Sequence, residues 1–268
     1  MRELAGDYEN RAFEASQFVD KLLALAQALG CWTVQCPEQG AWGYRDLDLL
    51  AITLAVQACL PVDIRPPSAG GGAFGMRTEH GVMCNKDLFA LYAVSRTCDL
   101  LREERDRIVC EIGGGTGTLA YYLAQAGVRE VWVYDLPTVS VVQGYYTMKS
   151  LGPERVWLYG EEPSSATVKL LPYWEYEHAP AKYFPLIFNQ DSLPEIEVSA
   201  ASEYIRLIRE KGSRWFLSIN QEARESNTVN KLQSVVYELI AGNGGLRRIY
   251  RFPYWMRAGY VEELYQIE

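Results

Sequence analysis

The sequence predicts an α/β fold with a doubly wound, mainly parallel seven-stranded sheet and a helical N-terminal cap. A strand, a glycine-rich turn, a helix and a second strand ending in an acid follow one another between Ile108 and Leu136. Strand-like apolar runs then alternate with helical stretches to the end of the chain, which is typical of a parallel sheet covered on both faces. Residues 1–105 hold only helical patterns and loops, so we expect them to form a cap and 106–268 to form the sheet domain.

The cap is predicted from apolar residues at helical spacing. Three helices are expected, over Tyr8 to Leu29, Leu47 to Leu60 and Asp87 to Arg105. The loop from Ile64 to Gly75 is rich in Pro and Gly, so it is either a lid over a substrate or a plain linker.

The sheet domain is predicted from its apolar runs and the turn residues between them. The expected strands are Ile108–Ile112, Val131–Tyr134, Arg155–Tyr159, Tyr183–Asn189, Trp215–Asn220, Leu246–Tyr254 and Tyr260–Ile267. The expected helices are Thr118–Gln125, Pro137–Met148, Glu197–Lys211 and Thr228–Ala241. The segment from Glu161 to Ala181 is expected to be irregular.

The glycine-rich turn favours a ligand that contains a ribose. Glycines let the backbone approach a ligand closely, and the following helix directs free N–H groups and a positive dipole end at it. Asp135 lies 22 positions after Gly113, near the ~20 expected for an acid that binds a ribose diol. The stretch from Gly115 to Ala120 also fits G-x-G-x-x-A, the pattern of nicotinamide cofactor sites, but Gly115 stands three residues beyond the strand end at Ile112.

Composition excludes some classes of function. The 268 residues carry a net charge of −8, which disfavours a nucleic-acid substrate. Only two histidines occur, which excludes a His-rich metal site, and the six cysteines lack zinc spacing. We therefore assign no metal ligand, and a carboxylate site for a hard cation stays open. No secretory leader or apolar run of membrane-spanning length is evident, so we expect a cytoplasmic protein.

The spacing Glu111-x-Gly113-x-Gly115-x-Gly117 resembles the first motif of class I S-adenosyl-L-methionine-dependent methyltransferases. The resemblance implies that Glu111 and these glycines surround the methionine part of S-adenosyl-L-methionine. It further implies roles for residues after the later strands: Asp135 and Leu136 at the ribose, Gly160 at the adenine and Asn189 near the reacting methyl.

Further blocks are similar to a narrower family, the bacterial sugar O-methyltransferases. They are V-Y-D-L-P, F-N-Q-D-S-L-P-E-I, L-S-I-N-Q-E-A and F-P-Y-W-M-R-A-G-Y-V-E-E-L-Y, and the similarity runs from about Gly70 to the end. This resemblance implies a sugar hydroxyl as the acceptor, free, in a glycan or in a glycosylated metabolite.

A sugar hydroxyl is a poor nucleophile while neutral, so a base or a metal is expected. Asp191, just after the fourth strand, is the first candidate, although it could equally be a turn residue. His80 is the rival base, although a lone loop histidine is more often a surface residue. Glu195 is either a ligand of the acceptor or a helix cap, and Asn220 and Glu222 either line the acceptor pocket or lie in a solvated loop.

Other classes of function stay open on the sequence alone. They are transfer to another small O or N acceptor, a nicotinamide-dependent oxidoreductase, and a non-catalytic scaffold. We also expect that the apolar N-terminal helices could form a homodimer.

Overall fold

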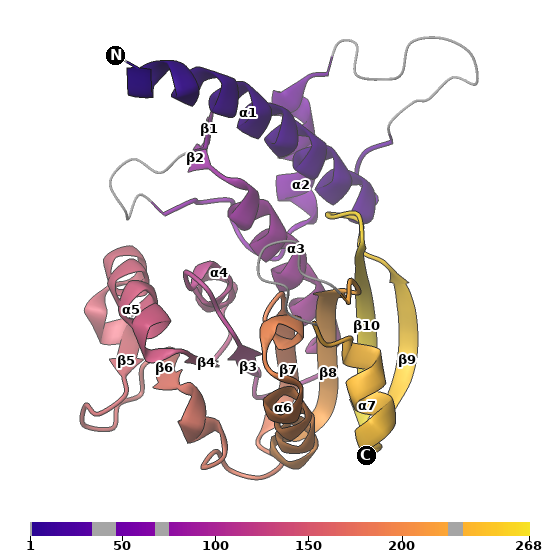
Figure 1. The fold of residues 1–268 in the computed structure, drawn as a ribbon. Helices are drawn as coiled ribbons and strands as arrows, with labels where there is room; N and C mark the ends of the chain where they lie inside the picture. The colour runs from indigo at the N-terminus through magenta and orange to yellow at the C-terminus, as the bar shows by residue number, and fades with distance from the viewer. Residues whose placement is uncertain (1, 34–46, 68–74, 225–232) are drawn as a thin grey trace. The chain divides into compact units, whose positions relative to one another are not determined.

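The computed structural model describes residues 2–33, 47–67, 75–224 and 233–268 (Figure 1). The chain divides into two compact units, Met1–Ser95 and Arg96–Glu268. Within the described residues, no helix is both long enough and apolar enough to cross a membrane.

The first unit is built from helices and one small hairpin. Its helices are α1 (Arg2–Ala28) and α2 (Leu49–Cys59), and its strands are β1 (Met76–Thr78) and β2 (Gly81–Met83). The side chain of Asp48 caps α2 by accepting a hydrogen bond from the Ala51 N–H. The helix α3 (Asn85–Leu100) contains the boundary between the units. Most of the expected lid or linker, residues 68–74, lies outside the described residues.

The second unit holds one eight-stranded sheet. Its strands are β3 (Ile108–Ile112), β4 (Glu130–Asp135), β5 (Val156–Leu158), β6 (Val168–Pro172), β7 (Phe184–Gln190), β8 (Gly212–Gln221), β9 (Leu246–Pro253) and β10 (Tyr260–Ile267). They lie in the order β5-β6-β4-β3-β7-β8-β10-β9. The first six run parallel, and β10 pairs antiparallel with both β8 and β9. The strand order reverses at β3, and a ligand site is expected beyond the carboxyl ends of strands at such a point.

The sheet has one strand more than the sequence predicts. Val168–Pro172 lies within the segment expected to be irregular, yet it forms β6 between β4 and β5. The predicted third strand is therefore the edge strand β5 and does not lie beside β4. Lys169 fits in the inserted strand because its ammonium group binds Glu130 at 2.7 Å and lies 4.4 Å from the centre of the Trp132 ring.

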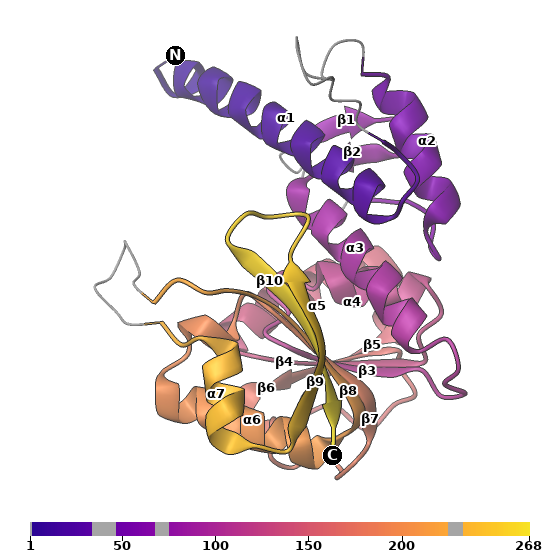
Figure 2. The same cartoon turned by 90° about the vertical axis from the view of Figure 1, so that its right-hand side faces the viewer.

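Helices cover both faces of this sheet (Figure 2). The helices α4 (Thr118–Gln125) and α5 (Pro137–Leu151) lie on one face, and α6 (Val198–Lys211) and α7 (Val236–Asn243) on the other. The predicted start of the last helix falls on residues 225–232, which are not described. Alternate residues of β3, Ile108, Cys110 and Ile112, join the core beneath α6 and α7. Glu111 therefore faces the α4 and α5 side.

Candidate functional site

The glycine-rich turn connects the carboxyl end of β3 to α4. Gly113, Gly115 and Gly117 have positive φ angles of 75°, 56° and 83°, a region that side chains disfavour. The Gly113 N–H donates to the Tyr134 carbonyl at 2.9 Å, which ties the turn to the end of β4. A Cβ at Gly115 would meet nothing within 4 Å, so this glycine borders open space.

Glu111 lies beneath this turn and is buried. Its Oε2 lies 3.1 Å from the position that a Cβ on Gly114 would take, and within the described residues it has no hydrogen-bond partner. Burial, and to a lesser degree the negative charge of Asp135, raises the pKa of Glu111 from 4.5 to about 8. A buried carboxyl group with an unpartnered oxygen is suited to accept a hydrogen bond from a cationic ligand group.

Asp135 ends β4 and faces the glycine turn. Its Oδ2 accepts hydrogen bonds from the Gly115 N–H at 3.1 Å and from Gln143 Nε2 at 2.7 Å, and its Oδ1 accepts from the Leu136 N–H at 2.7 Å. A fourth hydrogen bond comes from the Gly114 backbone, so the carboxylate, which offers about four acceptor positions, is engaged on all sides by the turn and its neighbours. Burial raises the pKa of Asp135, although these hydrogen bonds lower it. The sequence does not predict a role for Gln143, because no pattern marks a glutamine within a helix as the partner of an upstream acid.

Asn189 and Asn220 are buried in one amide network at the ends of β7 and β8. Asn189 Nδ2 donates to the Ile112 carbonyl at 2.9 Å, and its Oδ1 accepts from Asn220 Nδ2 at 2.9 Å. The hydroxyl of Ser192 donates to the same Ile112 carbonyl at 3.0 Å and also contacts Asn189 Nδ2. The side chain of Asn189 is thus engaged within the protein and holds the start of the glycine turn in place. Ser192 was missed from the sequence, where it stands out only as a turn residue.

Asp191 stands directly after β7 with a positive φ of 66°. Its N–H donates to the Ile219 carbonyl at 3.3 Å. Its half-exposed carboxylate lies 3.3 Å from Arg257 Nη1 and hydrogen-bonds to the Tyr260 hydroxyl. The guanidinium group of Arg257 also lies 4.1 Å from the centre of the Tyr260 ring. Arg257 and Tyr260 therefore hold Asp191 at the carboxyl edge of the sheet. The sequence analysis did not predict either of these partners.

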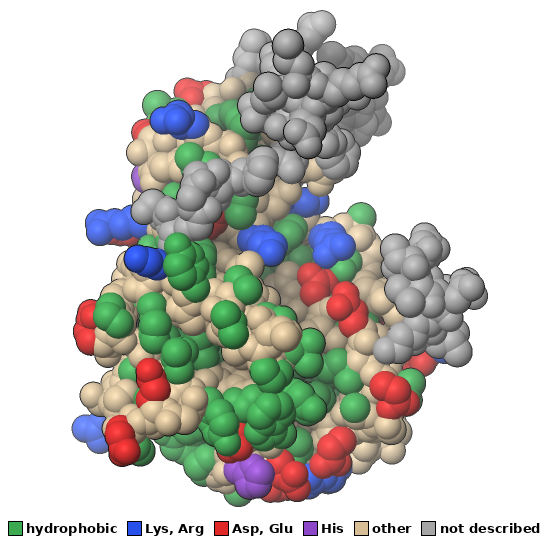
Figure 3. Space-filling view, turned by 60° about the vertical axis from the view of Figure 1, so that its left-hand side comes forward, with side chains coloured by type: hydrophobic (Ala, Val, Ile, Leu, Met, Phe, Trp, Pro, Cys, Tyr) green, Lys and Arg blue, Asp and Glu red, His purple; other side chains and the backbone are tan. Residues whose placement is uncertain are grey.

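Gly160 follows the third predicted strand, but the structure does not place that strand beside β4. Gly160 follows the edge strand β5 and is exposed, whereas β6 is the strand that lies beside β4. Two aromatic residues, Tyr173 and Trp174, follow β6 and remain 47% and 45% exposed. Leu136, after β4, is 55% exposed. Figure 3 brings the α5 side forward and shows hydrophobic side chains gathered on this face of the second unit.

Glu195 and Glu222 are candidates that follow the ends of β7 and β8. Glu195 is exposed in a short 3-10 helix and does not cap α6, because Glu197 is the cap and accepts from the Ser199 and Ala200 N–H groups. Glu222 follows β8 and binds Arg251 Nη2 through both carboxylate oxygens at 2.6 Å.

His80 belongs to the first unit. It is half-buried in the turn between β1 and β2, and its Nε2 lies 3.4 Å from Glu79 Oε1. Throughout the described part of the chain, no group of three His, Cys, Asp or Glu side chains is placed to hold a metal ion.

Comparison with protein-family models finds no match, and comparison with curated proteins finds none either. Solved structures with a similar fold include the mitomycin 7-O-methyltransferase MmcR, with 16% identity, a TM-score of 0.46 and coverage of 68% of this chain. This chain spans 57% of the length of that protein. Magnesium protoporphyrin IX methyltransferase from Synechocystis PCC 6803 with bound SAH has 16% identity, a TM-score of 0.49 and coverage of 69% of this chain and 83% of its own. The N-methyltransferase NodS from Bradyrhizobium japonicum WM9 has 13% identity and a TM-score of 0.46, and the match covers 64% of this chain and 85% of NodS.

Proposed function

We propose that this chain is an S-adenosyl-L-methionine-dependent O-methyltransferase whose acceptor is a sugar hydroxyl. The observation that carries the proposal is the pairing of a buried carboxyl group, Glu111, with a left-handed glycine turn at the switch point of the sheet. Within the described residues Oε2 of Glu111 has no hydrogen-bond partner, and the open space at Gly115 lets a ligand approach the backbone. The amino group of a methionine moiety would pair with this carboxyl group.

The residues present fit this cofactor. Glu111 would bind the amino group, and Asp135 would bind a ribose hydroxyl in exchange for one of its hydrogen bonds to the turn. We assign the adenine to three exposed residues: Leu136, which follows β4, and Tyr173 and Trp174, which follow β6. Gly160 follows the edge strand β5, so we place it at the outer border of the adenine site. Asn189 contributes by holding Ile112 at the start of the turn. When bound, the cofactor supplies an electrophilic methyl group on a sulfonium.

Asp191 is the proposed base. It removes the proton of the acceptor hydroxyl while that oxygen forms its bond to the methyl carbon and the carbon–sulfur bond breaks. Arg257 and Tyr260 hold the carboxylate in place, so the base needs little reorganisation. His80 stays the rival base, and Glu195, Asn220 and Glu222 stay the proposed acceptor side of the site.

The cofactor assignment is tested by calorimetric titration with S-adenosylhomocysteine and, separately, with NAD. Micromolar binding of S-adenosylhomocysteine that is lost in Asp135→Ala and in Gly115→Val would support the site. Binding of NAD alone would refute it and favour an oxidoreductase. Circular dichroism of each variant serves as the folding control.

The base is tested with the variants Asp191→Asn and His80→Gln. Removal of a general base lowers kcat by about 10²- to 10⁴-fold while KM for the acceptor changes little. Only the variant that lacks the base should lose the acidic limb of the pH–rate profile. An unchanged kcat in Asp191→Asn would move the assignment to His80.

We also propose that the N-terminal helices mediate a homodimer. Leu50 and Leu54 are one turn apart on α2 and are each 51% exposed, so they form one apolar strip on this helix. The pair of substitutions Leu50→Glu and Leu54→Glu should convert a dimer into a monomer in sedimentation analysis. A monomeric wild-type protein at micromolar concentration would refute this assignment.

A further inference from the structure

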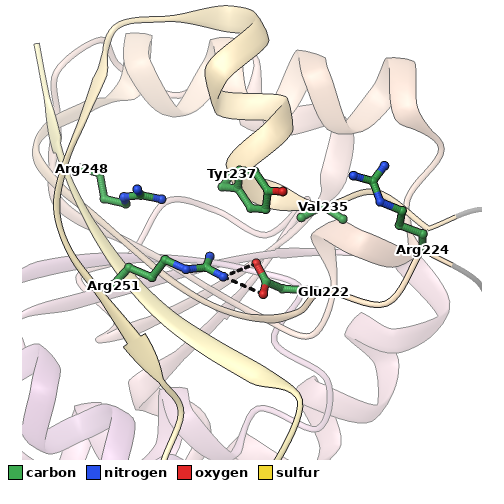
Figure 4. Close-up of a pocket in the computed structure, with 6 residues that line it drawn as sticks. All are labelled: Glu222, Arg224, Val235, Tyr237, Arg248 and Arg251. Atoms are coloured by element: carbon green, nitrogen blue, oxygen red, sulfur yellow. Dashed lines mark hydrogen bonds and ion pairs between the residues drawn. The ribbon is translucent and has the colours of Figure 1, made fainter.

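A second polar pocket lies in the second unit, between the end of β8, the start of α7 and β9 (Figure 4). Its volume is about 340 Å³. The residues that line it are Glu222, Arg224, Val235, Tyr237, Arg248 and Arg251. Three of these six side chains are guanidinium groups, and they come from two separate parts of the chain.

Two of these arginines are held from behind by one buried acid. Glu263 of β10 is 1% exposed and accepts hydrogen bonds from Arg248 Nη1 at 3.1 Å and Arg251 Nη1 at 3.0 Å. The ring of Tyr237 lies 5.4 Å from the guanidinium carbon of Arg251 and limits its movement. A carboxylate behind two guanidinium groups fixes their planes and leaves their other N–H groups for a ligand.

The donors of the pocket exceed its acceptors. A guanidinium group carries about five N–H donors. Arg248 hydrogen-bonds to Glu263 and Tyr265, and Arg251 hydrogen-bonds to Glu263 and to both carboxylate oxygens of Glu222. Arg224 contacts Glu238, and Arg251 Nη2 binds Glu222 at the rim of the pocket. Among the lining residues of the described chain, Glu222 is the single carboxylate beside three cations. Glu222 therefore occupies the position that an external anion would take on Arg251.

The pocket opens at the edge of the sheet where the methyl acceptor is proposed to bind. Glu222 follows β8, and β8 is the direct neighbour of β7, which ends beside Asp191. Adjacent strands are about 4.8 Å apart. The strand β10 lies between β8 and β9, so Arg251 of β9 reaches the end of β8 through its side chain, which contacts Glu222.

We propose that this pocket binds a small-molecule oxyanion, a phosphate or carboxylate group, through Arg224, Arg248 and Arg251, and that Glu222 competes with it for Arg251. The proposed anion site rests on the residues that line the pocket and on their contacts, not on the proposed function. Its assignment as the anchor of the methyl acceptor rests on the proposed function, and it narrows the acceptor to a sugar that carries a negative charge.

The first test is calorimetry at low ionic strength with inorganic phosphate on the wild type and on single variants. Arg248→Gln should weaken phosphate binding about tenfold, because a charge-assisted contact is lost while Arg251 still neutralises Glu263. Arg224→Gln should weaken it by a similar factor. Glu222→Gln should strengthen it about threefold or more, because the competing carboxylate is gone. A purely structural role for these side chains would not give changes of opposite sign.

Arg206→Gln is the matched control. Arg206 is an exposed arginine of α6 that pairs with Glu203 and Glu210, so its loss changes the net charge equally but leaves the pocket intact. Equal weakening by Arg206→Gln and Arg248→Gln would reduce the effect to net charge and overturn the proposal. No phosphate binding to the wild type or to Glu222→Gln would overturn it as well.

The second test identifies the chemistry of the ligand with glucose 1-phosphate, glucuronate and glucose as probes. Binding of either charged sugar in preference to glucose, weakened in Arg248→Gln, supports the site and distinguishes phosphate from carboxylate. Equal binding of glucose would refute it. Titration of the same variants with S-adenosylhomocysteine distinguishes the proposed anion pocket from the proposed methyltransferase function. Intact cofactor binding without anion binding refutes only the pocket, and anion binding without cofactor binding refutes only the methyltransferase assignment.

Discussion

The substitution Glu111→Gln should change how the stability of the protein depends on pH. The pKa of the Glu111 carboxyl is about 8 in the folded protein and 4.5 in an unperturbed chain. Between these values the folded state holds a proton that the unfolded state has lost, so the free energy of unfolding falls as the pH rises. At about 1.4 kcal/mol per pH unit, the loss from pH 4.5 to pH 8 amounts to about 5 kcal/mol.

A glutamine of the same shape does not titrate, so the variant should lack this loss. Urea unfolding of both proteins at pH 5, 6, 7 and 8 gives the difference in unfolding free energy directly. Titratable groups that do not interact with Glu111 cancel in that difference. The gap should widen in favour of Glu111→Gln by about 1.4 kcal/mol for each pH unit and level off above pH 8. Parallel pH dependences for the two proteins would show that Glu111 titrates normally and would refute the reasoning.

The same carboxyl group gives a signature in cofactor binding. At pH 7 most of the unliganded protein carries the Glu111 proton, and pairing with an ammonium group would favour the carboxylate. S-adenosylhomocysteine should therefore release close to one proton, measured by calorimetry in buffers with different ionisation enthalpies. The release should be absent from Glu111→Gln. Equal release by both proteins would place the proton on another group.

Three further changes test the framework around the site by urea unfolding. Gly113→Ala should cost about 3 kcal/mol and Gly115→Ala about 1 kcal/mol, because both add a Cβ at an unfavourable φ angle but only the first also clashes, with the hydroxyl of Ser192. Equal costs would contradict this. Asn189→Ala should cost about 2 kcal/mol through the broken amide network, and a neutral effect would show that the network adds no stability. Arg96→Met should cost about 3 kcal/mol, because Glu262 is fully buried 3.0 Å from Arg96 Nε and would lose its charged partner. Rescue by removing both charges would confirm the pairing, and a cost that persists in the double variant would refute it.

The sequence was most informative where apolar runs meet glycine or proline. The bounds of β3, α4 and β10 agree with the predicted residues, since buried strands and a glycine turn leave strong local patterns. The strand β6 was missed because it is five residues long, carries Lys169 and ends in a proline. Its lysine is tolerated only through Glu130 and Trp132, and those contacts come from another strand. No local pattern could reveal them.

The candidate site was predictable in its position but not in the direction of its side chains. The turn spacing identified Glu111 and Asp135 at the ends of adjacent strands. The same reasoning proposed that Asn189 faces a cofactor, whereas its amide is engaged by Ile112 and Asn220. Whether an amide at a strand end faces inward depends on the neighbouring strand, and a single sequence does not encode that directly. Gln143 and Arg257 were not predicted either, because each meets its acid, Asp135 or Asp191, only once distant segments have folded together.

The carbonyl of Ile112 accepts from both Asn189 and Ser192, and Asn189 in turn accepts from Asn220. The ends of β3, β7 and β8 are therefore linked by one continuous chain of buried hydrogen bonds. A substitution that breaks one link should disturb the ends of its neighbours as well as its own strand end. Under the proposed function, this chain connects the cofactor side of the site to the side proposed for the acceptor.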